Sequence, residues 1–262
     1  MHEDIFQRVN MHLHDNIRWS PVSNGGTSNY IYHGMRHDMP LILRINGASE
    51  LTFGTDRYRE HSVLTAIQPF NWSMQVLGCD PDAGWCVMKD HGEPISNKQL
   101  HHHHSLLQNR LLSMAEDFQL IVSPQRFSYP DLFILYQQRL NLLPEAAYWL
   151  NQLDQLVALY RKLPDISFCL VHHDLHKGNL LIDDSDELSL KIIDWEYAGV
   201  GNPWFDIAML YTEFEISASD LSALPIFSEL SYEEFIPGLK DAIQFNQLLA
   251  KLWYRIREEN HL

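Results

Sequence analysis

The sequence predicts an α+β protein of two lobes, a small β-rich N-lobe at residues 1–88 and a mainly helical C-lobe at residues 89–262. Two observations predict this class. The first ninety residues contain short β-type runs around one helical segment, whereas the apolar residues beyond Gly92 recur mostly with helical spacing. The chain has no internal repeat and no low-complexity linker. The change of pattern at 88–92 therefore favours a hinge between two lobes.

The β-type runs of the N-lobe differ from its helical segment in residue type and spacing. Residues 29–33 alternate between apolar and polar types, 40–45 are rich in β-forming residues, and 84–88 end before Asp90. Residues 55–67 have the composition of a helix. We therefore expect three strands and one helix in this lobe.

The C-lobe is predicted to be helical except for a region of short β-type runs. Residues 145–163 carry an apolar stripe at helical spacing, which we interpret as core. Short β-type runs follow at 169–171, 180–182 and 188–193, with a turn at 183–186, and the remainder is expected to be helical. The members of the stripe are Trp149, Leu153, Leu156, Val157, Tyr160 and Leu163.

Composition excludes several classes of function. The 262 residues are 45% apolar with a formal net charge of −15, and nucleic-acid binding requires clustered Lys and Arg. No window approaches the roughly 20 apolar residues of a membrane span, and the acidic start does not resemble a signal peptide. We expect a cytoplasmic protein with a small-molecule substrate, and the sequence leaves the oligomeric state open. The three cysteines, Cys79, Cys86 and Cys169, are interpreted as thiols that form no disulfide.

Two carboxylates and an amide follow the spacing that phosphoryl transfer needs. This reaction depends on positioned metal ions, a carboxylate that orients the attacking hydroxyl, and cations at the phosphates. Asp174 and Asn179 are five positions apart, as in the catalytic loop of protein kinases, where the Asp takes the hydroxyl proton and the Asn binds metal. Asp194 follows a β-type run twenty positions after Asp174, where a second metal-binding carboxylate is expected.

The histidines around this loop allow a competing interpretation. His172, His173 and His176, together with Asp174, could bind zinc if the segment were a helix, because residues four apart share one helix face. Gly178 and the adjoining apolar runs favour strand–loop–strand instead, and a purely structural loop is the other alternative. The four histidines at 101–104 point in different directions on a helix, so we expect a solvated face there.

The N-lobe contains residues suited to binding phosphates. A glycine turn that opens a strand can bring backbone N–H groups close to phosphate oxygens. Arg44 then ends an apolar strand and Glu60 lies in the next helix, which is the placement of the phosphate-binding cation and its carboxylate in kinases, with Arg in place of the usual Lys. The residues of the turn are Gly25, Gly26, Thr27, Ser28 and Asn29.

These motifs together resemble the choline, ethanolamine and thiamine kinase branch of the aminoglycoside-phosphotransferase-like kinases. The resemblance is carried by the glycine turn, Leu-Arg-Ile at 43–45, His-x-Asp-Leu-His-x-Gly-Asn at 172–179, Ile-Asp-Trp-Glu-Tyr-Ala-Gly at 193–199 and Asn-Pro-Trp-Phe-Asp at 202–206. It covers nearly the whole chain and implies a protein-kinase-like fold that uses ATP and Mg²⁺.

The resemblance also implies a role for each matching residue. Asp174 would be the catalytic base, His176 would lie near the transferred phosphate, and Asp206 would brace the loop. Asn179 and Asp194 would hold Mg²⁺. The glycine turn, Arg44 and Glu60 would bind or support the ATP phosphates, and the backbone at Met88 would bind adenine.

The acceptor is expected to be a small alcohol. His173 replaces the Arg of protein kinases, and the twelve positions from Asp194 to Asp206 leave no room for an activation loop. Carboxylates and aromatic rings suit a cationic acceptor such as thiamine or choline. Aminoglycosides, sugars, homoserine and methylthioribose stay open, as does nucleotide or cation binding without turnover. The proposed acceptor residues are Glu196, Tyr197, Trp204 and Trp253.

Overall fold

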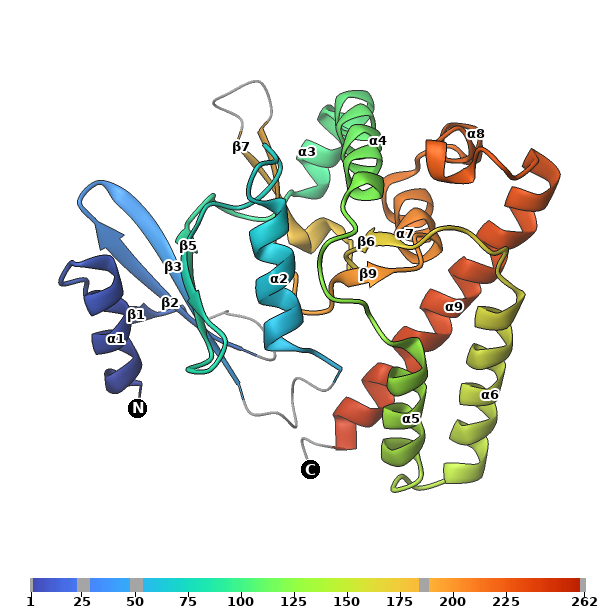
Figure 1. Ribbon diagram of the computed structural model, residues 1–262, viewed down its shortest axis with the longest axis horizontal. Coiled ribbons are helices and arrows are strands. Elements are labelled where there is room, and N and C mark those ends of the chain that lie inside the picture. Colours follow the sequence, from blue (N-terminus) through green and yellow to red (C-terminus); the bar gives the residue numbers. More distant parts are fainter. Residues whose placement is uncertain (1, 23–28, 48–53, 184–188, 260–262) are drawn as a thin grey trace. The chain divides into compact units, whose positions relative to one another are not determined.

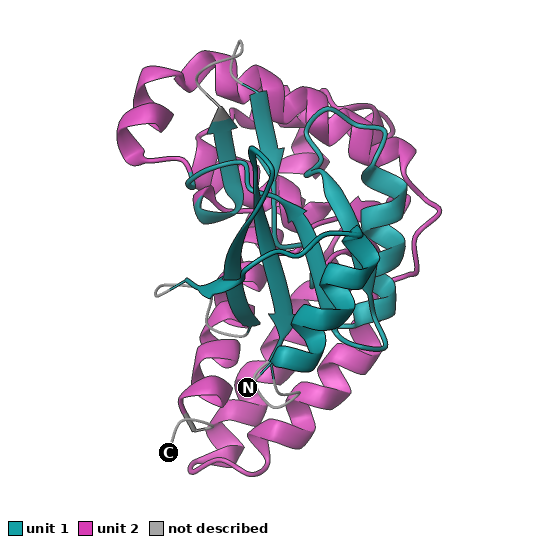
Figure 2. Cartoon of the chain, turned by 90° about the vertical axis from the view of Figure 1, so that its left-hand side faces the viewer, with its two compact units in different colours: residues 1–94, 178–196 teal, residues 95–177, 197–262 magenta. Residues whose placement is uncertain are grey.

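The computed structural model describes residues 2–22, 29–47, 54–183 and 189–259. The chain forms two compact units that are discontinuous in sequence (Figure 2). The first comprises Met1–Pro94 with Gly178–Glu196, and the second comprises Ile95–Lys177 with Tyr197–Leu262. Residues 178–196 thus group with the N-terminal residues, although the sequence placed them in the C-lobe. The functional lobes at 1–88 and 89–262 stay a prediction.

The first unit contains an antiparallel sheet in the order β1-β2-β3-β5-β4 (Figure 1). The three predicted strands are confirmed as β2, β3 and β5. The sequence did not predict β4, because this strand contains Gly78 and glycine is disfavoured in strands. The pairing of β4 with β5 shifts its register next to Gly78. The strands are β1 (Ser20–Pro21), β2 (Asn29–Arg36), β3 (Met39–Asn46), β4 (Val76–Asp80) and β5 (Trp85–Lys89).

Two helices pack on this sheet. Helix α2 (Arg57–Ile67) confirms the predicted helix, and Asp56 caps it by accepting the N–H groups of Tyr58 and Arg59. Helix α1 (Glu3–Leu13) was not predicted. Side chains alternate along a strand, so Leu43 of β3 joins the core beneath α1 whereas Arg44 turns toward α2.

A hairpin explains why residues 178–196 belong to the first unit. Strands β7 (Leu180–Asp183) and β8 (Ser189–Ile192) pair antiparallel. The Ile192 N–H donates to the carbonyl of Trp72 at 3.0 Å, in the connection between α2 and β4. The rings of Trp72 and Trp195 lie 5.8 Å apart. These contacts fix the hairpin to the N-terminal part of the chain.

The second unit is mainly helical, as predicted. Helices α5, α6 and α9 lie side by side (Figure 1). Of the predicted core stripe, Leu153 and Leu156 are buried, whereas its other members are half-buried. One strand was not predicted: β9 (Gly199–Gly201) pairs antiparallel with β6 (Cys169–Val171). The helices are α3 (Asn97–His102), α4 (His104–Leu120), α5 (Tyr129–Leu140), α6 (Ala146–Lys162), α7 (Trp204–Phe214), α8 (Ala218–Ser222) and α9 (Tyr232–Glu259). Two 3₁₀ turns, η1 (Lys177–Asn179) and η2 (Pro225–Phe227), complete the elements.

The interpretation of the cysteines as three thiols is wrong. Cys79 and Cys86 form a disulfide, and only Cys169 is a free, buried thiol. The register of β4 with β5 places the two bridged residues directly opposite each other, with their Cα atoms 4.1 Å apart. Because β4 was not recognised in the sequence, nothing there indicated that these cysteines face each other.

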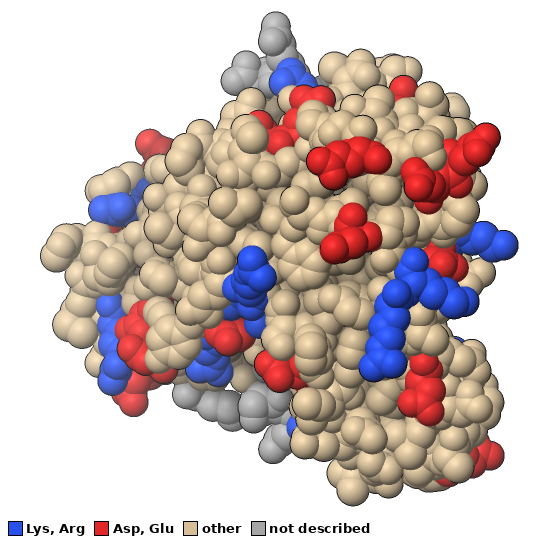
Figure 3. Space-filling model, turned by 45° about the vertical axis from the view of Figure 1, so that its right-hand side comes forward, with Lys and Arg blue, Asp and Glu red and all other residues tan. Residues whose placement is uncertain are grey.

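Two further properties concern the apolar character of the helices and the distribution of surface charge. Among the helices that the structure describes, none is long and apolar enough to cross a membrane. On the face drawn in Figure 3, Lys and Arg side chains are interleaved with Asp and Glu, and they form no continuous basic surface there.

Candidate active site

Three residues that the sequence singled out separately lie together in the first unit. The Arg44 Nη2 donates to the Glu60 carboxylate at 2.5 Å, and its Nη1 lies 3.7 Å from the Asp194 carboxylate. Arg44 and Glu60 are buried, while the Asp194 side chain is 40% exposed. Strand β3, helix α2 and the end of β8 thus supply one charged cluster.

The electrostatics of this cluster keep Arg44 charged. Burial alone would lower the pKa of its guanidinium, but the carboxylates of Glu60, Asp194 and Glu196 raise the pKa above its ordinary value. The buried Nε–H of Arg44 has no acceptor among the described residues, and the Nη1 contact with Asp194 is longer than a hydrogen bond. Arg44 therefore keeps hydrogen-bonding capacity that its described partners do not use.

The two predicted metal ligands lie at the same end of the β7–β8 hairpin. Leu180 pairs with Ile192, and the Ile193 N–H donates to the carbonyl of Asn179 at 3.0 Å. Asn179 is buried, and Asp194 has a left-handed φ of 66°. An amide and a carboxylate suit Mg²⁺, which takes oxygen ligands and usually completes its shell with waters and substrate phosphates. The donor set fits this ion.

The glycine turn can be assessed only at its last residue. Gly25, Gly26, Thr27 and Ser28 lie outside the described residues. The side-chain amide of Asn29 donates to the Glu196 carboxylate at 2.8 Å. Glu196 is buried, so this carboxylate binds a neighbouring part of its own unit. A direct contact with an acceptor stays a prediction.

Met88 lies inside the sheet. It belongs to β5, opposite Ile42 of β3 on one side and Val76 of β4 on the other. The next residue, Lys89, donates its N–H to the carbonyl of Gln75 at 2.9 Å. A role of the Met88 backbone in binding adenine stays a prediction.

The predicted catalytic loop lies in the second unit and is held through its backbone. The N–H groups of His172 and His173 donate to the two carboxylate oxygens of Asp206, at 2.6 and 3.0 Å. The Asp174 N–H then donates to the Nδ1 of His172 at 3.3 Å. The side chain of Asp174 is 42% exposed, and its carboxylate lies 3.6 Å from the Nε2 of His176. The loop thus exposes a carboxylate beside an imidazole.

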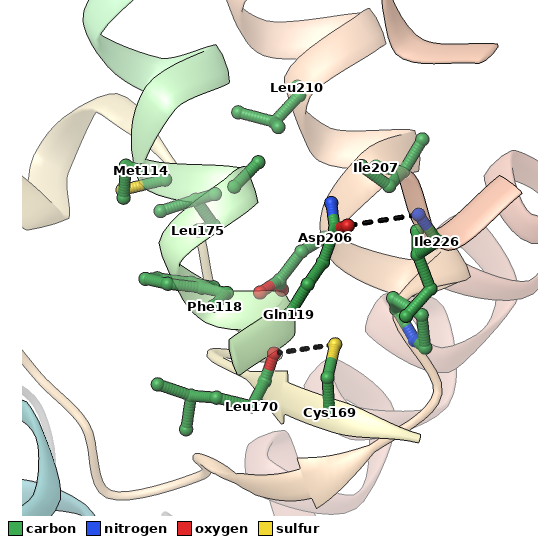
Figure 4. A pocket seen from close by; sticks show the side chains of 12 residues that line it. Met114, Phe118, Gln119, Cys169, Leu170, Leu175, Asp206, Ile207, Leu210 and Ile226 are labelled. Carbon is green, nitrogen blue, oxygen red and sulfur yellow. Dashed lines mark hydrogen bonds between the residues drawn. The ribbon is translucent and has the colours of Figure 1, made fainter. Parts of the chain in front are cut away.

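Asp206 is a buried acid in apolar surroundings. Burial raises the pKa of its carboxyl to about 7, the backbone N–H groups of His172 and His173 oppose this rise, and the charge of Asp174 adds to it. Figure 4 shows the small cavity that Asp206 borders, together with labelled apolar side chains such as Leu175. Cys169 also borders this cavity, and burial raises the pKa of its thiol to about 12. The low polarity of this cavity explains why both acids resist ionisation.

The predicted acceptor residues separate into two groups. The indole N–H of Trp253 donates to the hydroxyl of Tyr197 at 3.3 Å, and the guanidinium of Arg257 covers one face of that indole at 4.6 Å from the ring centre. Trp204, in contrast, is fully buried and packs against Phe227. Its inclusion among the acceptor residues is therefore corrected: Trp204 is a core residue, because a ring without exposed surface cannot contact a substrate.

Sequence reasoning missed the contacts that surround His173. The Tyr129 hydroxyl lies 2.8 Å from the Nε2 of His173 and accepts the Asn202 N–H at 2.7 Å. In the sequence, Ser128 and Pro130 indicate only the start of a helix. Tyr129 is 44 positions from His173, and no sequence pattern links residues at that separation.

The fold is that of protein-kinase-like phosphotransferases. A crystal structure of choline kinase LicA from Streptococcus pneumoniae superposes with a TM-score of 0.68 at 20% identity, covering 98% of this chain and 91% of the other. A crystal structure of LicA in complex with AMP gives a TM-score of 0.71 at 18% identity, covering 98% and 90%. At these identities the likeness establishes the fold.

The chain belongs to the phosphotransferase enzyme family (APH), whose family model matches residues 82–234. Among individual relatives, the thiamine kinase of Shigella boydii is 33% identical over 88 residues. That match covers 34% of this chain and 31% of the relative, so the chain matches about a third of the length of this curated relative.

Proposed function

We infer that the protein is an ATP-dependent phosphotransferase that phosphorylates the hydroxyl of a small alcohol. The observation that carries this inference is the loop at 172–174, whose backbone is fixed by both oxygens of Asp206 while the Asp174 carboxylate stays accessible. A general base must reach the substrate from a defined position, and this loop supplies both properties. Membership of the phosphotransferase family supports the same reaction.

The side chains supply the parts of phosphoryl transfer that a protein must provide. Asp174 accepts the proton of the acceptor hydroxyl while that oxygen attacks the γ-phosphorus and ADP leaves. His176, whose Nε2 lies 3.6 Å from the Asp174 carboxylate, would donate to the transferred phosphate. Arg44, held by Glu60, binds an ATP phosphate with the hydrogen-bonding capacity it retains.

The proposed cofactors are ATP and Mg²⁺. Asn179 and Asp194 would hold the ion through one amide and one carboxylate oxygen. When bound, Mg²⁺ would neutralise charge on the phosphates. Phosphate and water oxygens would supply the remaining ligands of the ion. The LicA complex with AMP supports a nucleotide as the other ligand.

The first candidate acceptor is a cationic alcohol such as thiamine or choline. Its support is the likeness to thiamine kinase over 88 residues and to choline kinase LicA in fold. One observation favours a second candidate, an uncharged or zwitterionic alcohol such as a sugar or homoserine. Arg257 is buried and covers a face of Trp253, so a cation of the protein already occupies one surface of the proposed aromatic cage.

A screen of acceptors tests the activity and the acceptor together. ADP formation would be measured with Mg²⁺ and ATP in the presence of thiamine, choline, ethanolamine, homoserine, methylthioribose, aminoglycosides and sugars. One of them should stimulate turnover and yield a phosphate monoester in ³¹P NMR. No stimulation by any acceptor, combined with measurable ATP binding, would favour a non-catalytic nucleotide-binding protein.

The first prediction concerns Asp174 and distinguishes catalysis of phosphoryl transfer from ligand binding without turnover. We expect Asp174→Asn to lower kcat at least about 100-fold, because removal of a general base typically costs 10²–10⁴ in rate. The midpoint of thermal unfolding should change little, since the side chain is 42% exposed. The matched control is Asp154→Asn, at an exposed position of α6. Equal turnover of the Asp174 variant and wild type would exclude Asp174 from the mechanism.

A further inference from the structure

The side chain of His173 is fixed at both ring nitrogens within the second unit. Its Nε2 lies 2.8 Å from the Tyr129 hydroxyl, and its Nδ1 lies 3.0 Å from the carbonyl oxygen of Tyr197. Tyr129 is 2% exposed, and its hydroxyl also accepts the Asn202 N–H at 2.7 Å. A chain of hydrogen bonds thus joins the catalytic loop to the segment that contains β9.

The partners determine which atom donates in each of these bonds. A carbonyl oxygen can only accept, so the Nδ1 of His173 must carry a proton and donate to Tyr197. The neutral ring then has an unprotonated Nε2, which accepts the Tyr129 O–H. Burial raises the pKa of the Tyr129 phenol well above its ordinary value, so the phenol remains protonated and able to donate. Each donor in this series of hydrogen bonds then faces an acceptor.

The surrounding packing leaves the His173 ring little freedom. The Phe127 ring lies 4.2 Å from it, centre to centre. A Cβ atom on Gly201 would lie 2.6 Å from the Tyr129 hydroxyl oxygen and 3.0 Å from the His173 ring, so only glycine allows this approach. His173 also has a φ of 66°, a left-handed conformation that costs energy in a non-glycine residue. The contacts of its side chain offset that cost.

We propose that Tyr129 is a positioning residue for phosphoryl transfer, which acts through His173 to fix the backbone from which Asp174 projects. This inference rests on the proposed function. Asp206 holds the N–H groups of His172 and His173, whereas Tyr129 holds the His173 side chain. The loop is thereby fixed both by its backbone and by a side chain next to Asp174.

Kinetics of matched variants test the proposal. Tyr129→Phe removes one hydroxyl, and we expect kcat to fall about tenfold with KM for ATP and acceptor nearly unchanged, because a small misplacement of a catalytic group lowers rate more than binding. The control is Tyr160→Phe, whose ring lies 4.9 Å from that of Tyr129 but whose hydroxyl has no hydrogen bond in the described part of the chain. This control should keep wild-type kcat.

A double-mutant comparison separates positioning from general packing. His173→Gly removes the other half of the contact and suits the left-handed backbone. The double variant should have the same kcat as His173→Gly alone, because Tyr129 has nothing left to act through. Additive losses, or an equal loss in Tyr160→Phe, would overturn the proposal. Should Tyr129→Phe not fold, His173→Gly with an unchanged kcat would overturn it as well.

A readout independent of activity distinguishes this proposal from the proposed function. Two-bond ¹H–¹⁵N spectra of histidine-labelled protein should show His173, assigned by its absence in His173→Gly, protonated at Nδ1, with its Nε2 resonance shifted in Tyr129→Phe. Protonation at Nε2 instead would overturn the positioning role. Absence of turnover with every acceptor, together with the Nδ1-protonated spectrum, would count against the proposed function and leave the contact established.

Discussion

The two units hold their candidate catalytic groups by different forces. In the first unit, Arg44 is held by ionised partners, Glu60 at 2.5 Å and Asp194 at 3.7 Å. In the second, the loop that carries Asp174 is held by the backbone N–H groups of His172 and His173, which donate to the Asp206 carboxylate, and by the contact between Tyr129 and the His173 side chain. The first unit thus positions the charge of Arg44 by means of other charges, and the second positions the carboxylate of Asp174 by means of the backbone of its loop.

This difference follows from what each group would do in the proposed reaction. A phosphate-binding Arg must remain ionised while buried, and buried charges are tolerated only when they are paired. A catalytic base must remain accessible to the substrate, so we expect the main chain of its loop to fix its position. The units should therefore respond differently to removal of a partner and to pH.

The largest effect is expected from breaking the buried ion pair. Glu60→Leu leaves Arg44 buried without its main partner, and we expect a loss of about 3–5 kcal/mol in the free energy of unfolding. Replacing both residues, as Arg44→Met with Glu60→Leu, should restore most of this stability while abolishing turnover. Urea unfolding and the kinase assay measure the two effects. A double variant less stable than the Glu60→Leu protein would contradict an ion pair held chiefly by mutual charge.

A pH effect of similar size is expected from Asp206. Its pKa is about 7 in the folded protein, above the roughly 3.9 of an unfolded Asp, so the unfolded chain releases this proton first. Its contribution to stability is complete below pH about 4 and is lost as pH rises through 7. Wild type should thus lose about 3 kcal/mol between pH 5 and pH 8 that Asp206→Asn does not lose. Parallel urea-unfolding profiles for the two proteins would disprove this assignment.

The smallest of these effects comes from the disulfide. Cys79 and Cys86 are seven positions apart, and closing so short a loop stabilises by about 2 kcal/mol through the entropy of the unfolded chain. Reduction should lower the unfolding free energy of wild type by that amount and leave a Cys79→Ser, Cys86→Ser variant unchanged. Thiol titration of the unfolded protein should find Cys169 alone before reduction. Three reactive thiols before reduction would rule out the bridge.

The sequence predicted those parts of the fold that depend on local pattern. Strands β2, β3 and β5 follow from alternation and β-forming residues, and helix α2 follows from its composition, and these signals lie within a few residues of each other. It missed α1, β1, β4 and β9. Strand β4 contains Gly78, and β9 is Gly-Val-Gly, so neither has strand-forming composition, and both are strands because their partners β5 and β6 pair with them.

The residues of the candidate site likewise divide into those that local sequence pattern predicted and those that only the packing of the fold decided. The residue types and spacing at 172–179 and 193–199 determined the proposed chemistry, because Asp174, Asn179 and Asp194 must follow each other at fixed intervals for phosphoryl transfer. By its residue type alone, Trp204 was as suitable for contacting the acceptor as the other proposed aromatic residues, because composition does not distinguish an aromatic residue in a cage from one in the core. Its complete burial decided the question.

The sequence by itself determined the class of fold, and it predicted the acid residues of the proposed reaction and the cation that would accompany them. Only the tertiary structure decided that Cys79 faces Cys86, that Arg257 covers Trp253, and that Tyr129 holds His173. The reason is physical: spacing along the chain encodes local geometry, whereas these contacts arise when strands and helices far apart in sequence pack together. Such packing depends on the fit of all the buried side chains at once.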